Sequence, residues 1–373
     1  MTGKLWVNGW SSPLVSVVMS VYNGERFLRE AVESILDQSF RDFEFIIIND
    51  GSTDCSASLL DFYQKNDPRV RVYHQENRGL VESLNRGCEL AQGKYIARMD
   101  ADDISVTNRL MWQVEFMERH PEVGILGGAV EVIDTTGKSL EISANPIEDR
   151  ELRSALLDYC AFWHPTVFMR KDIVVSVGGY RKIVFGSEDY DLWLRAADHC
   201  QLANLEAVLL HYRLHPHQVT VSRFRQLAFS TLAAQAAAAF RRSGSPDPLD
   251  LIEEITPAVL VGLGLSETTQ QAALALRCLW SIRALYNNGE YSVAAKVLNE
   301  MLQSCDWKQA EKWIIADLRL LAAKLYWRQG RFVRSIVIAG HAIITRPLIL
   351  GRPIKSLHRW VKYGRLGFAR HGG

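Results

Sequence analysis

Three carboxylates follow directly on a short apolar segment of this chain, and they form the part of the sequence best suited to chemistry. Tyr95–Met99 has the pattern of a buried strand, and Asp100, Asp102 and Asp103 follow its carboxyl end. In an extended segment, residues i and i+2 point to the same side, so Asp100 and Asp102 can approach one ligand together. Carboxylates this close repel one another unless a cation lies among them. The cluster therefore predicts a site for Mg²⁺ or Mn²⁺ and for a nucleotide that brings its phosphates to the ion.

A further acid, Asp50, follows a second apolar run, Phe43–Ile48. Open α/β sheets place their ligand crevice at the carboxyl ends of their strands, so we expect Asp50 to lie near the first cluster. Its carboxylate could accept a hydrogen bond from the imide N–H of a pyrimidine. The alternative is structural, because Asp-Gly-Ser at 50–52 is also an ordinary turn sequence.

The segments around these acids alternate between strand and helix patterns. Strands are predicted at Val15–Val21, Phe43–Ile48, Arg69–Tyr73 and Tyr95–Met99, and helices at Glu25–Gln38, Ser56–Lys65 and Leu80–Ala91. Apolar strands that alternate with helices indicate βαβ units and a mainly parallel sheet covered on both faces.

The second half of the chain is predicted to be helical. Two of its segments, Ala284–Tyr291 and Lys324–Phe332, share an aromatic–Gly–aromatic pattern, which is typical of a degenerate tetratricopeptide corner; a generic helical bundle is the alternative. At 373 residues, two or three domains are expected. The predicted divisions are an extension (1–12), an α/β domain (13–222), a connecting helix and linker (223–245), a helical domain (246–345) and a basic amphipathic tail (346–373).

Charge is distributed unevenly along the chain. The formal net charge is +1, but residues 318–373 hold twelve Lys or Arg and no Asp or Glu. We expect its last part, the basic amphipathic tail 346–373, either to contact an anionic membrane or to pack on its own helical domain. It lacks aromatic stacking platforms for RNA, so no nucleic acid partner is expected.

Several classes of protein are disfavoured by composition. With 48% hydrophobic and 23% charged residues, the chain is globular. Its six cysteines are scattered and fit a reducing cytosol better than a zinc knuckle or a disulfide framework. Residues 1–12 lack the apolar core of a signal peptide, and no apolar run reaches the ~20 residues of a spanning helix. We therefore expect a cytoplasmic protein, in peripheral contact with the inner face of the membrane.

Four motifs in sequence order resemble family 2 glycosyltransferases with the GT-A fold. They are Pro13–Asn23, Ile48–Asp54, Met99–Asp103 and Gly186–Trp193. Four ordered motifs are more specific than any one alone. The resemblance implies a metal-assisted, inverting transferase that moves a sugar from a nucleotide donor, with UDP favoured, to a hydroxyl of a glycan or lipid-linked saccharide.

The resemblance also implies which residues bind the donor and the metal ion. Tyr22 would lie beside uracil, although an aromatic residue closing the core is the alternative. Asp100 would reach the ribose. The expected donor-binding residues are Ser20, Tyr22, Asn23, Asp50, Asp100 and Arg109, and the expected metal ligands are Asp102 and His215.

Three of the residues near this site have alternative interpretations. Asp103 could assist at the site or cap the following helix. Arg109 could reach a phosphate or pair with Asp103. His215 could be structural, and by resemblance Arg213 would lie beside the phosphates.

Catalysis is assigned by the same resemblance to the acid pair Glu188–Asp189. Asp189 would be the general base and Glu188 would contact the acceptor, while the helix dipole also favours acids at such a helix start. Supporting residues on the acceptor side or in its loop are expected to be Gly178, Gly179, His164 and Asp191. Two other interpretations remain open: a catalytically silent GT-A-fold binding or regulatory protein, and a scaffold that uses its helical domain.

Overall fold

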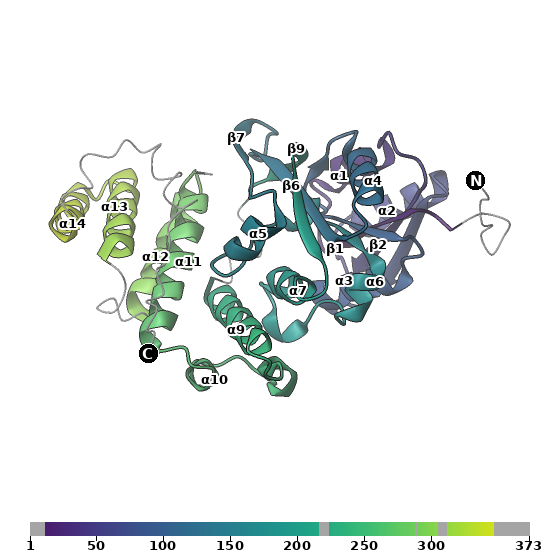
Figure 1. Ribbon diagram of the computed structural model, residues 1–373. Coiled ribbons are helices and arrows are strands. Elements are labelled where there is room, and N and C mark those ends of the chain that lie inside the picture. Colours follow the sequence, from purple (N-terminus) through teal and green to yellow (C-terminus); the bar gives the residue numbers. More distant parts are fainter. Residues whose placement is uncertain (1–11, 216–223, 288, 305–311, 347–373) are drawn as a thin grey trace. The chain divides into compact units, whose positions relative to one another are not determined.

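The computed structural model describes residues 12–215, 224–287, 289–304 and 312–346, and the chain divides into two compact units, 1–214 and 215–373 (Figure 1). Most of the expected N-terminal extension and the tail from residue 347 lie outside the described residues, as does the expected domain boundary at 222. The helix predicted as a connector belongs by its contacts to the second unit.

The first unit alternates strands and helices through its first half, as predicted. The strands are β1 Val15–Val21, β2 Phe43–Asp50, β3 Val70–Gln75, β4 Tyr95–Met99, β5 Ile104–Ser105, β6 Val123–Ile133, β7 Ser139–Ser143, β8 Phe168–Arg170 and β9 Gln201–Arg213. The α-helices are α1 Leu28–Leu36, α2 Ser56–Asn66, α3 Leu80–Leu90, α4 Arg109–Arg119, α5 Asp149–Ala155, α6 Lys171–Ser176 and α7 Glu188–Ala196, with 3₁₀ turns η1 His164–Thr166 and η2 Lys182–Val184.

Among the described residues, the strands form one sheet in the order β3-β2-β1-β4-β8-β6-β9-β5, and β7 pairs with β6. Strands β1 to β4 are parallel where they pair, as are β6 and β9. Strand β8 runs antiparallel between β4 and β6. The predicted α/β class with a mainly parallel sheet is confirmed.

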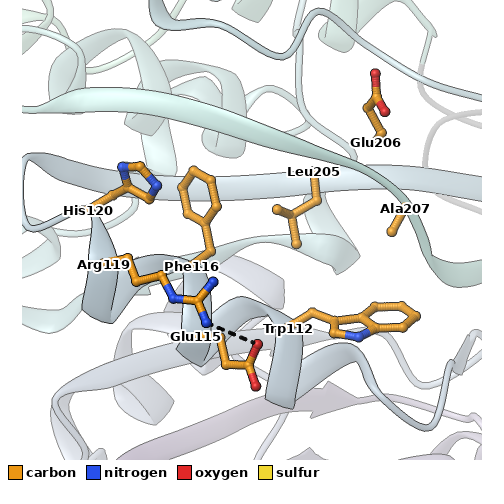
Figure 2. A pocket seen from close by; sticks show the side chains of 8 residues that line it. All are labelled: Trp112, Glu115, Phe116, Arg119, His120, Leu205, Glu206 and Ala207. Atoms are coloured by element: carbon orange, nitrogen blue, oxygen red, sulfur yellow. Dashed lines mark ion pairs between the residues drawn. The ribbon is translucent and has the colours of Figure 1, made fainter.

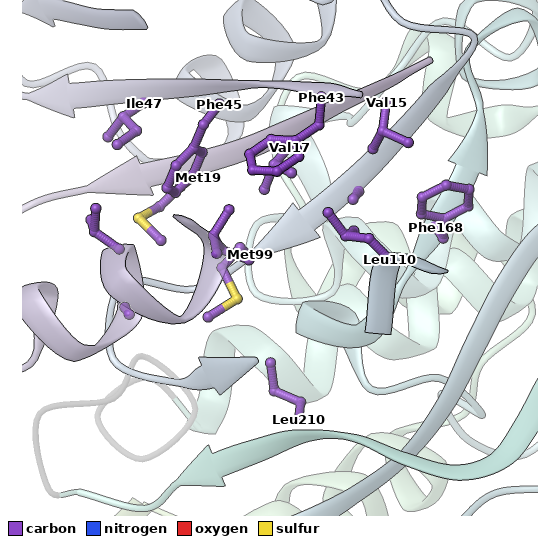
Figure 3. Packing of buried hydrophobic residues seen from close by; sticks show 14 of the residues in the cluster. Val15, Val17, Met19, Phe43, Phe45, Ile47, Met99, Leu110, Phe168 and Leu210 are labelled. Carbon is purple, nitrogen blue, oxygen red and sulfur yellow. The ribbon is translucent and has the colours of Figure 1, made fainter. Parts of the chain in front are cut away.

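The main hydrophobic core of this unit lies on one face of the sheet (Figure 3). Alternate residues from Val15 to Val21 of β1 point into it, because side chains alternate between the faces of a strand. Helices α1, α2 and α4 contribute Leu28, Leu60 and Leu110 to the same cluster. Helix α3 packs on the opposite face, where a Cβ on Gly87 would lie 2.4 Å from Val18 Cγ1. Burial on both faces explains why the strands are continuously apolar.

The second unit consists of helices in its described part. They are α9 Phe224–Arg242, α10 Pro257–Gly262, α11 Glu267–Asn287, α12 Tyr291–Ser304, α13 Lys312–Arg328 and α14 Phe332–Thr345, with the 3₁₀ turn η3 Pro248–Leu251. None of the described helices combines the length and apolar character needed to cross a bilayer.

The two predicted aromatic–Gly–aromatic corners are helix–turn–helix corners with the same geometry. Gly289 and Gly330 both have positive φ, at 79° and 73°, as the C-terminal glycine of a Schellman motif requires. A ring contact crosses each corner, at 5.1 Å between Tyr286 and Tyr291 and at 4.8 Å between Trp327 and Phe332. The equivalent of Tyr286 is therefore Trp327, one residue beyond the Tyr326 that the sequence pattern paired with it.

Candidate functional site

Strand register brings the predicted donor residues to one edge of the sheet. Ser20 of β1 pairs with Ile48 of β2, and Met19 pairs with Met99 of β4. Asp50, the last residue of β2, and Asp100, which follows β4, therefore lie at the same end of the two strands that flank β1. This is the carboxyl edge, where α/β sheets bind ligands.

The loops after β1 and β2 are joined by polar contacts. Asn23 has a positive φ of 51°, and its backbone N–H donates to Ser52 Oγ at 3.0 Å. Thr53 N–H donates to Asn23 Oδ1 at 2.8 Å. Next to this link, the Tyr22 side chain is 55% exposed, so it does not close the core. An exposed aromatic ring on a fixed loop can stack on a planar base.

The carboxylate of Asp50 is buried and organises the loop after β3. Its Oδ1 accepts from Arg78 N–H at 2.8 Å and from Gln75 Nε2 at 2.7 Å, and its Oδ2 accepts from Gly79 N–H at 2.8 Å. An ionised carboxylate has about four acceptor positions, so one remains on Oδ2. Asp50 is thus more than a turn residue, because it fixes the backbone that precedes α3.

Asp100, Asp102 and Asp103 each offer a carboxylate oxygen within 4.8 Å of the others. Burial, followed by the charges of Asp102 and Asp100, raises the pKa of Asp103 well above its usual value. Asp103 Oδ2 is buried without a hydrogen-bond partner. The crowded carboxylates of Asp100 and Asp102 fit Mg²⁺ or Mn²⁺, which prefer carboxylate ligands, and Asp103 lies beside them with its proton favoured by its raised pKa.

Asp103 does not cap a helix, because α4 begins only at Arg109. Instead its Oδ1 accepts the backbone N–H of Arg213 at 2.8 Å. The Arg213 side chain is also buried: its Nε donates to the Asp102 carbonyl at 2.9 Å, and its guanidinium lies 4.5 Å from the Phe27 ring centroid. The structure thus places Arg213 behind the acidic segment and not at a surface where phosphates could reach it.

Arg98 connects the two predicted groups of acids. It lies on β4, is 3% exposed, and forms an ion pair with Asp100. Burial opposes its charge, but nearby carboxylates, Asp100 first, outweigh burial and raise the pKa of Arg98. The same guanidinium acts electrostatically on Glu188, His164 and Tyr180. The acids that follow β4 and those that begin α7 therefore border one buried cation.

Glu188 and Asp189 form the first turn of α7, after Ser187 at the N-cap. Glu188 is almost fully buried, and its Oε2 accepts from Gly186 N–H. Burial, then the charge of Asp189, raises the pKa of Glu188 to about 7. Asp189 is half-buried and accepts from Tyr190 N–H at 2.7 Å and from the Cys160 thiol at 3.7 Å. A carboxyl whose pKa is raised to about 7, next to a second carboxyl, is suited to acid–base chemistry.

His164 is connected to the surroundings of this acid pair through Tyr180, whose pKa is raised by burial and also by the charges of the two acids. Its Nε2 is 3.0 Å from the hydroxyl of Tyr180, and burial followed by the charge of Arg98 lowers the pKa of His164 well below 6.5. Asn85 fixes Tyr180 by bonding both its backbone N–H and its carbonyl at 2.8 Å. His164 is therefore a neutral group that can orient a neighbour but carries no charge near pH 7.

Gly178 and Gly179 form the turn between α6 and Tyr180. Both have positive φ, 77° and 68°, and a Cβ on Gly179 would lie 2.7 Å from Asn85 Oδ1. Arg195 Nη2 donates to the Gly179 carbonyl at 2.7 Å. The glycines therefore shape the backbone next to the acids.

Asp191 belongs to the same group of contacts that supports the Gly178–Gly179 turn, and it does not face an open surface. It is fully buried and forms ion pairs with Arg181 and Arg195. Residues two apart in a helix point about 200° apart, so Asp191 faces away from Asp189. Its supporting role is structural, through the arginines that hold the Gly178–Tyr180 turn.

The structure corrects the prediction for Arg109 and leaves that for His215 open. Arg109 is fully buried, donates to the Arg98 carbonyl at 2.7 Å, and has its pKa lowered to about 9 by burial and by the charge of Arg98. It therefore lies in the core, out of reach of a donor phosphate. His215 is the first residue of the second unit, and its role as a metal ligand stays a prediction.

A pocket of about 380 Å³ lies away from these acids, between α4 and β9 (Figure 2). Trp112, Phe116 and Leu205 are among its lining residues, and an ion pair of 3.9 Å joins Arg119 to Glu115 at its side. None of the predicted site residues lines it.

Sequence reasoning did not single out Arg98, Tyr180 or Asn85. Arg98 could have been identified from the sequence, because it is a charged residue inside the apolar run Tyr95–Met99, immediately before the acids. No local sequence pattern indicated Tyr180 or Asn85, because their importance rests on a contact between residues that are 95 positions apart in the chain.

Comparisons with known proteins give a consistent result. The family model described as Glycosyl transferase family 2 matches residues 16–177. A Haemophilus influenzae protein named as an uncharacterized glycosyltransferase is 34% identical over 224 residues, covering 56% of this chain and 68% of the relative. The O-antigen biosynthesis glycosyltransferase WbnJ of Escherichia coli is 34% identical over 207 residues, covering 54% of this chain and 80% of WbnJ. S. aureus TarS 1–349, solved in complex with UDP-GlcNAc, is similar with a TM-score of 0.52 at 15% identity, covering 87% of this chain and 90% of that one.

Proposed function

Because the chain belongs to glycosyl transferase family 2 and has the GT-A fold, it is a glycosyltransferase, and we propose that it transfers a sugar from a UDP donor with inversion at the anomeric carbon. The observation that carries this proposal is the position of Arg98. Its guanidinium pairs with Asp100 and also acts electrostatically on Glu188, which supports a single site shared by the donor edge and the acid pair of α7.

The donor base and ribose are assigned to the loops at the sheet edge. Tyr22 offers an exposed ring for stacking, and the free acceptor position of Asp50 suits the imide N–H of uracil. Ser20 and Asn23 are assigned to the same donor-binding edge, and Asp100 is assigned to the ribose. Support for UDP as the carrier also comes from TarS, a protein of the same fold whose structure was solved with UDP-GlcNAc bound.

A divalent ion, Mg²⁺ or Mn²⁺, is assigned to the acidic cluster. Asp102 would be its main protein ligand, with Asp100 beside it. When bound, such an ion neutralises charge on the departing diphosphate. The contact of Arg213 with the Asp102 carbonyl would hold this segment in place.

The proton transfer is assigned to Asp189. In an inverting transfer, a carboxylate opposite the leaving group takes the acceptor hydroxyl proton as its oxygen attacks. The pKa of Glu188, raised to about 7, lets Glu188 hold a proton near neutral pH beside the proposed base. Glu188 would then contact the acceptor as a hydrogen-bond donor.

The acceptor is proposed to be a hydroxyl of a glycan or of a lipid-linked saccharide in polysaccharide biosynthesis. WbnJ, which is 34% identical, is named for O-antigen biosynthesis. We also propose a cytoplasmic location, supported by the free thiols Cys55, Cys88, Cys160 and Cys200.

The test is a transfer assay after a screen of nucleotide sugars by thermal shift. Asp189→Asn should lower the transfer rate by roughly 10²–10⁴-fold, because it removes the base, while UDP binding stays within about threefold of wild type. Exposed Asp198→Asn, at the end of α7, is the matched control and should be unaffected. Full turnover by Asp189→Asn would refute the base assignment. Binding of UDP with no transfer or donor hydrolysis by wild type would favour a silent binding protein.

A further inference from the structure

The last described helix, α14, carries apolar side chains on the face that it turns to water. Val333, Ile336 and Ile344 are 78%, 64% and 78% exposed, and Val337 is also exposed. They recur at spacings of three, four, seven and eight residues, so they lie in one stripe along the helix. We call Val333, Ile336, Val337 and Ile344 the α14 stripe.

The α14 stripe is not the face by which the helix packs in its own unit. The opposite face holds the buried residues Ser335 and Ala342, and Ser335 Oγ donates to the Ala323 carbonyl of α13 at 2.7 Å. A surface helix usually has a polar outer face, and so do the terminal helices of repeat arrays. The apolar outer face of α14 therefore indicates a second binding surface, in addition to the face that packs on α13.

The charged groups described around the stripe are cationic. Arg331 and Arg334 are exposed at the start of α14, and Lys324 and Arg328 are exposed near the end of α13. Between residues 312 and 346 the sequence has a single carboxylate, Asp317, which is buried. An apolar stripe bordered by cations, with no exposed acid in this stretch, is complementary to a surface that is both apolar and anionic.

We propose that the α14 stripe docks on the surface of an anionic lipid bilayer. Its apolar side chains would enter the boundary between headgroups and acyl chains, and the flanking cations would face the phosphates. A helix of 14 residues is about 21 Å long, too short to span, so it lies in the plane of the surface. Docking of a second copy through the same stripe is disfavoured, because it would bring like charges together.

The experiment is flotation of the full-length protein with vesicles of phosphatidylcholine, with and without phosphatidylglycerol. Wild type should float with the anionic vesicles, and about 0.5 M NaCl should weaken the binding. The triple variant Val333→Ser, Ile336→Ser, Ile344→Ser should lower the partition coefficient roughly tenfold or more, because it removes the apolar insertion. Arg331→Gln with Arg334→Gln should lower it on anionic vesicles only.

The matched control places serine at exposed apolar residues elsewhere. Ile142 of β7 is 68% exposed and Leu251 of η3 is 89% exposed, so Ile142→Ser with Leu251→Ser removes comparable apolar surface. This variant should float like wild type.

Four results would overturn the proposal: no flotation by wild type, equal loss in the control, vesicle binding that the stripe variant leaves unchanged, or a stripe variant that changes oligomeric state without changing flotation. The melting midpoint is measured in parallel. A fall of several degrees in the stripe variant would show that the chain itself covers the stripe, which would also contradict lipid docking. Flotation needs no sugar donor, so it can fail or succeed independently of the proposed transfer reaction.

Discussion

At the scale of single residues, the site is a balance between crowded acids and one buried cation. Arg98 is almost fully buried and lies between the acids after β4 and those at the start of α7. A buried charge is tolerated only when it is paired, so each side of the site depends on the other. The pKa of Glu188 is about 7, because burial and the charge of Asp189 raise it more than the backbone N–H groups of Glu188 and Gly186 and the charge of Arg98 lower it.

The first prediction concerns the pH dependence of stability. A carboxyl with a higher pKa in the folded than in the unfolded chain holds its proton more tightly when folded, so the free energy of unfolding falls as pH rises from about 4.5 to about 7. Glu188→Gln removes this loss. We expect the gain in unfolding free energy over wild type to be about 1–2 kcal/mol larger at pH 8 than at pH 5.5, measured by urea titration.

The control for this prediction is Glu76→Gln, because Glu76 is an exposed carboxyl. It should change the unfolding free energy little at either pH. A Glu188→Gln effect that is the same at both pH values would show that Glu188 titrates as an ordinary carboxyl.

The second prediction separates two adjacent acids. Asp102→Asn should weaken Mn²⁺ binding by about 10–100-fold, whereas Asp103→Asn should weaken it by less than about threefold. The reason is that the raised pKa of Asp103 keeps it a poor anion, and an amide oxygen can still accept the Arg213 N–H. Calorimetric titration with Mn²⁺ measures both. Equal losses in the two variants would contradict the separate roles.

At the scale of elements, the position of each acid depends on where a strand ends or a helix begins. The sequence was sufficient to predict β1, β2 and β4 and the acids that follow them, because apolar periodicity and clustered carboxylates are local signals. The assignment of Asp189 as the base and of Asp191 to a supporting role came from the family resemblance, and the helix explains why the two residues differ. Two residues apart, they share a face in a strand and oppose each other in a helix, and α7 begins at Glu188.

The alternatives at Arg109 could not be decided locally either. Whether it meets a phosphate or pairs with Asp103 depends on the path of β4 and α4, which buries it and brings it to the Arg98 carbonyl. Arg98 and Arg109 are both arginines near the acids in sequence, yet only Arg98 borders them as a paired cation. Which residue an arginine pairs with depends on the tertiary structure and cannot be predicted from spacing in the sequence.

The third prediction tests the turn that supports the acid pair. Gly178 and Gly179 both have positive φ, so alanine at either should cost about 1 kcal/mol of unfolding free energy. The new Cβ at Gly179 would lie 2.7 Å from Asn85 Oδ1, whereas the new Cβ at Gly178 would have no atom within 4 Å. Gly179→Ala should therefore cost more than Gly178→Ala and should also lower transfer activity, because Asn85 fixes Tyr180.

Gly178→Ala is the matched control for backbone strain. Thermal unfolding and initial transfer rates of the two variants give the comparison. If both variants behave alike, the contact between Gly179 and Asn85 does not position the site.

At the scale of the whole molecule, the predicted donor site and the helices of the second half lie in separate compact units. The donor edge, the acids and Arg98 all lie within residues 1–214, and the α14 stripe lies within 215–373. The helical unit has its own hydrophobic core, which includes Ile282, Leu298 and Leu325. Its hairpin pattern could be seen in the sequence, but not the exposed outer face of α14, because burial depends on packing.

The fourth prediction follows from this division. UDP with Mn²⁺ should slow amide hydrogen exchange in the loops at 22–24, 51–54 and 100–103, because a ligand stabilises the segments that hold it. The helices α11 and α13 should exchange at unchanged rates. Mass spectrometry with peptide resolution makes the measurement. Protection confined to the helical unit would place nucleotide binding outside the predicted site.

The most direct test of the central claim is calorimetric titration of UDP in the presence of Mn²⁺ into wild type and three single variants. We predict that Asp50→Asn and Asp102→Asn each weaken UDP binding by roughly tenfold or more, because one removes the proposed contact to the base and the other the metal ligand. Asp189→Asn, although transfer is lost, should bind UDP like wild type. Wild-type affinity in both Asp50→Asn and Asp102→Asn would contradict a nucleotide site at the carboxyl edge of this sheet.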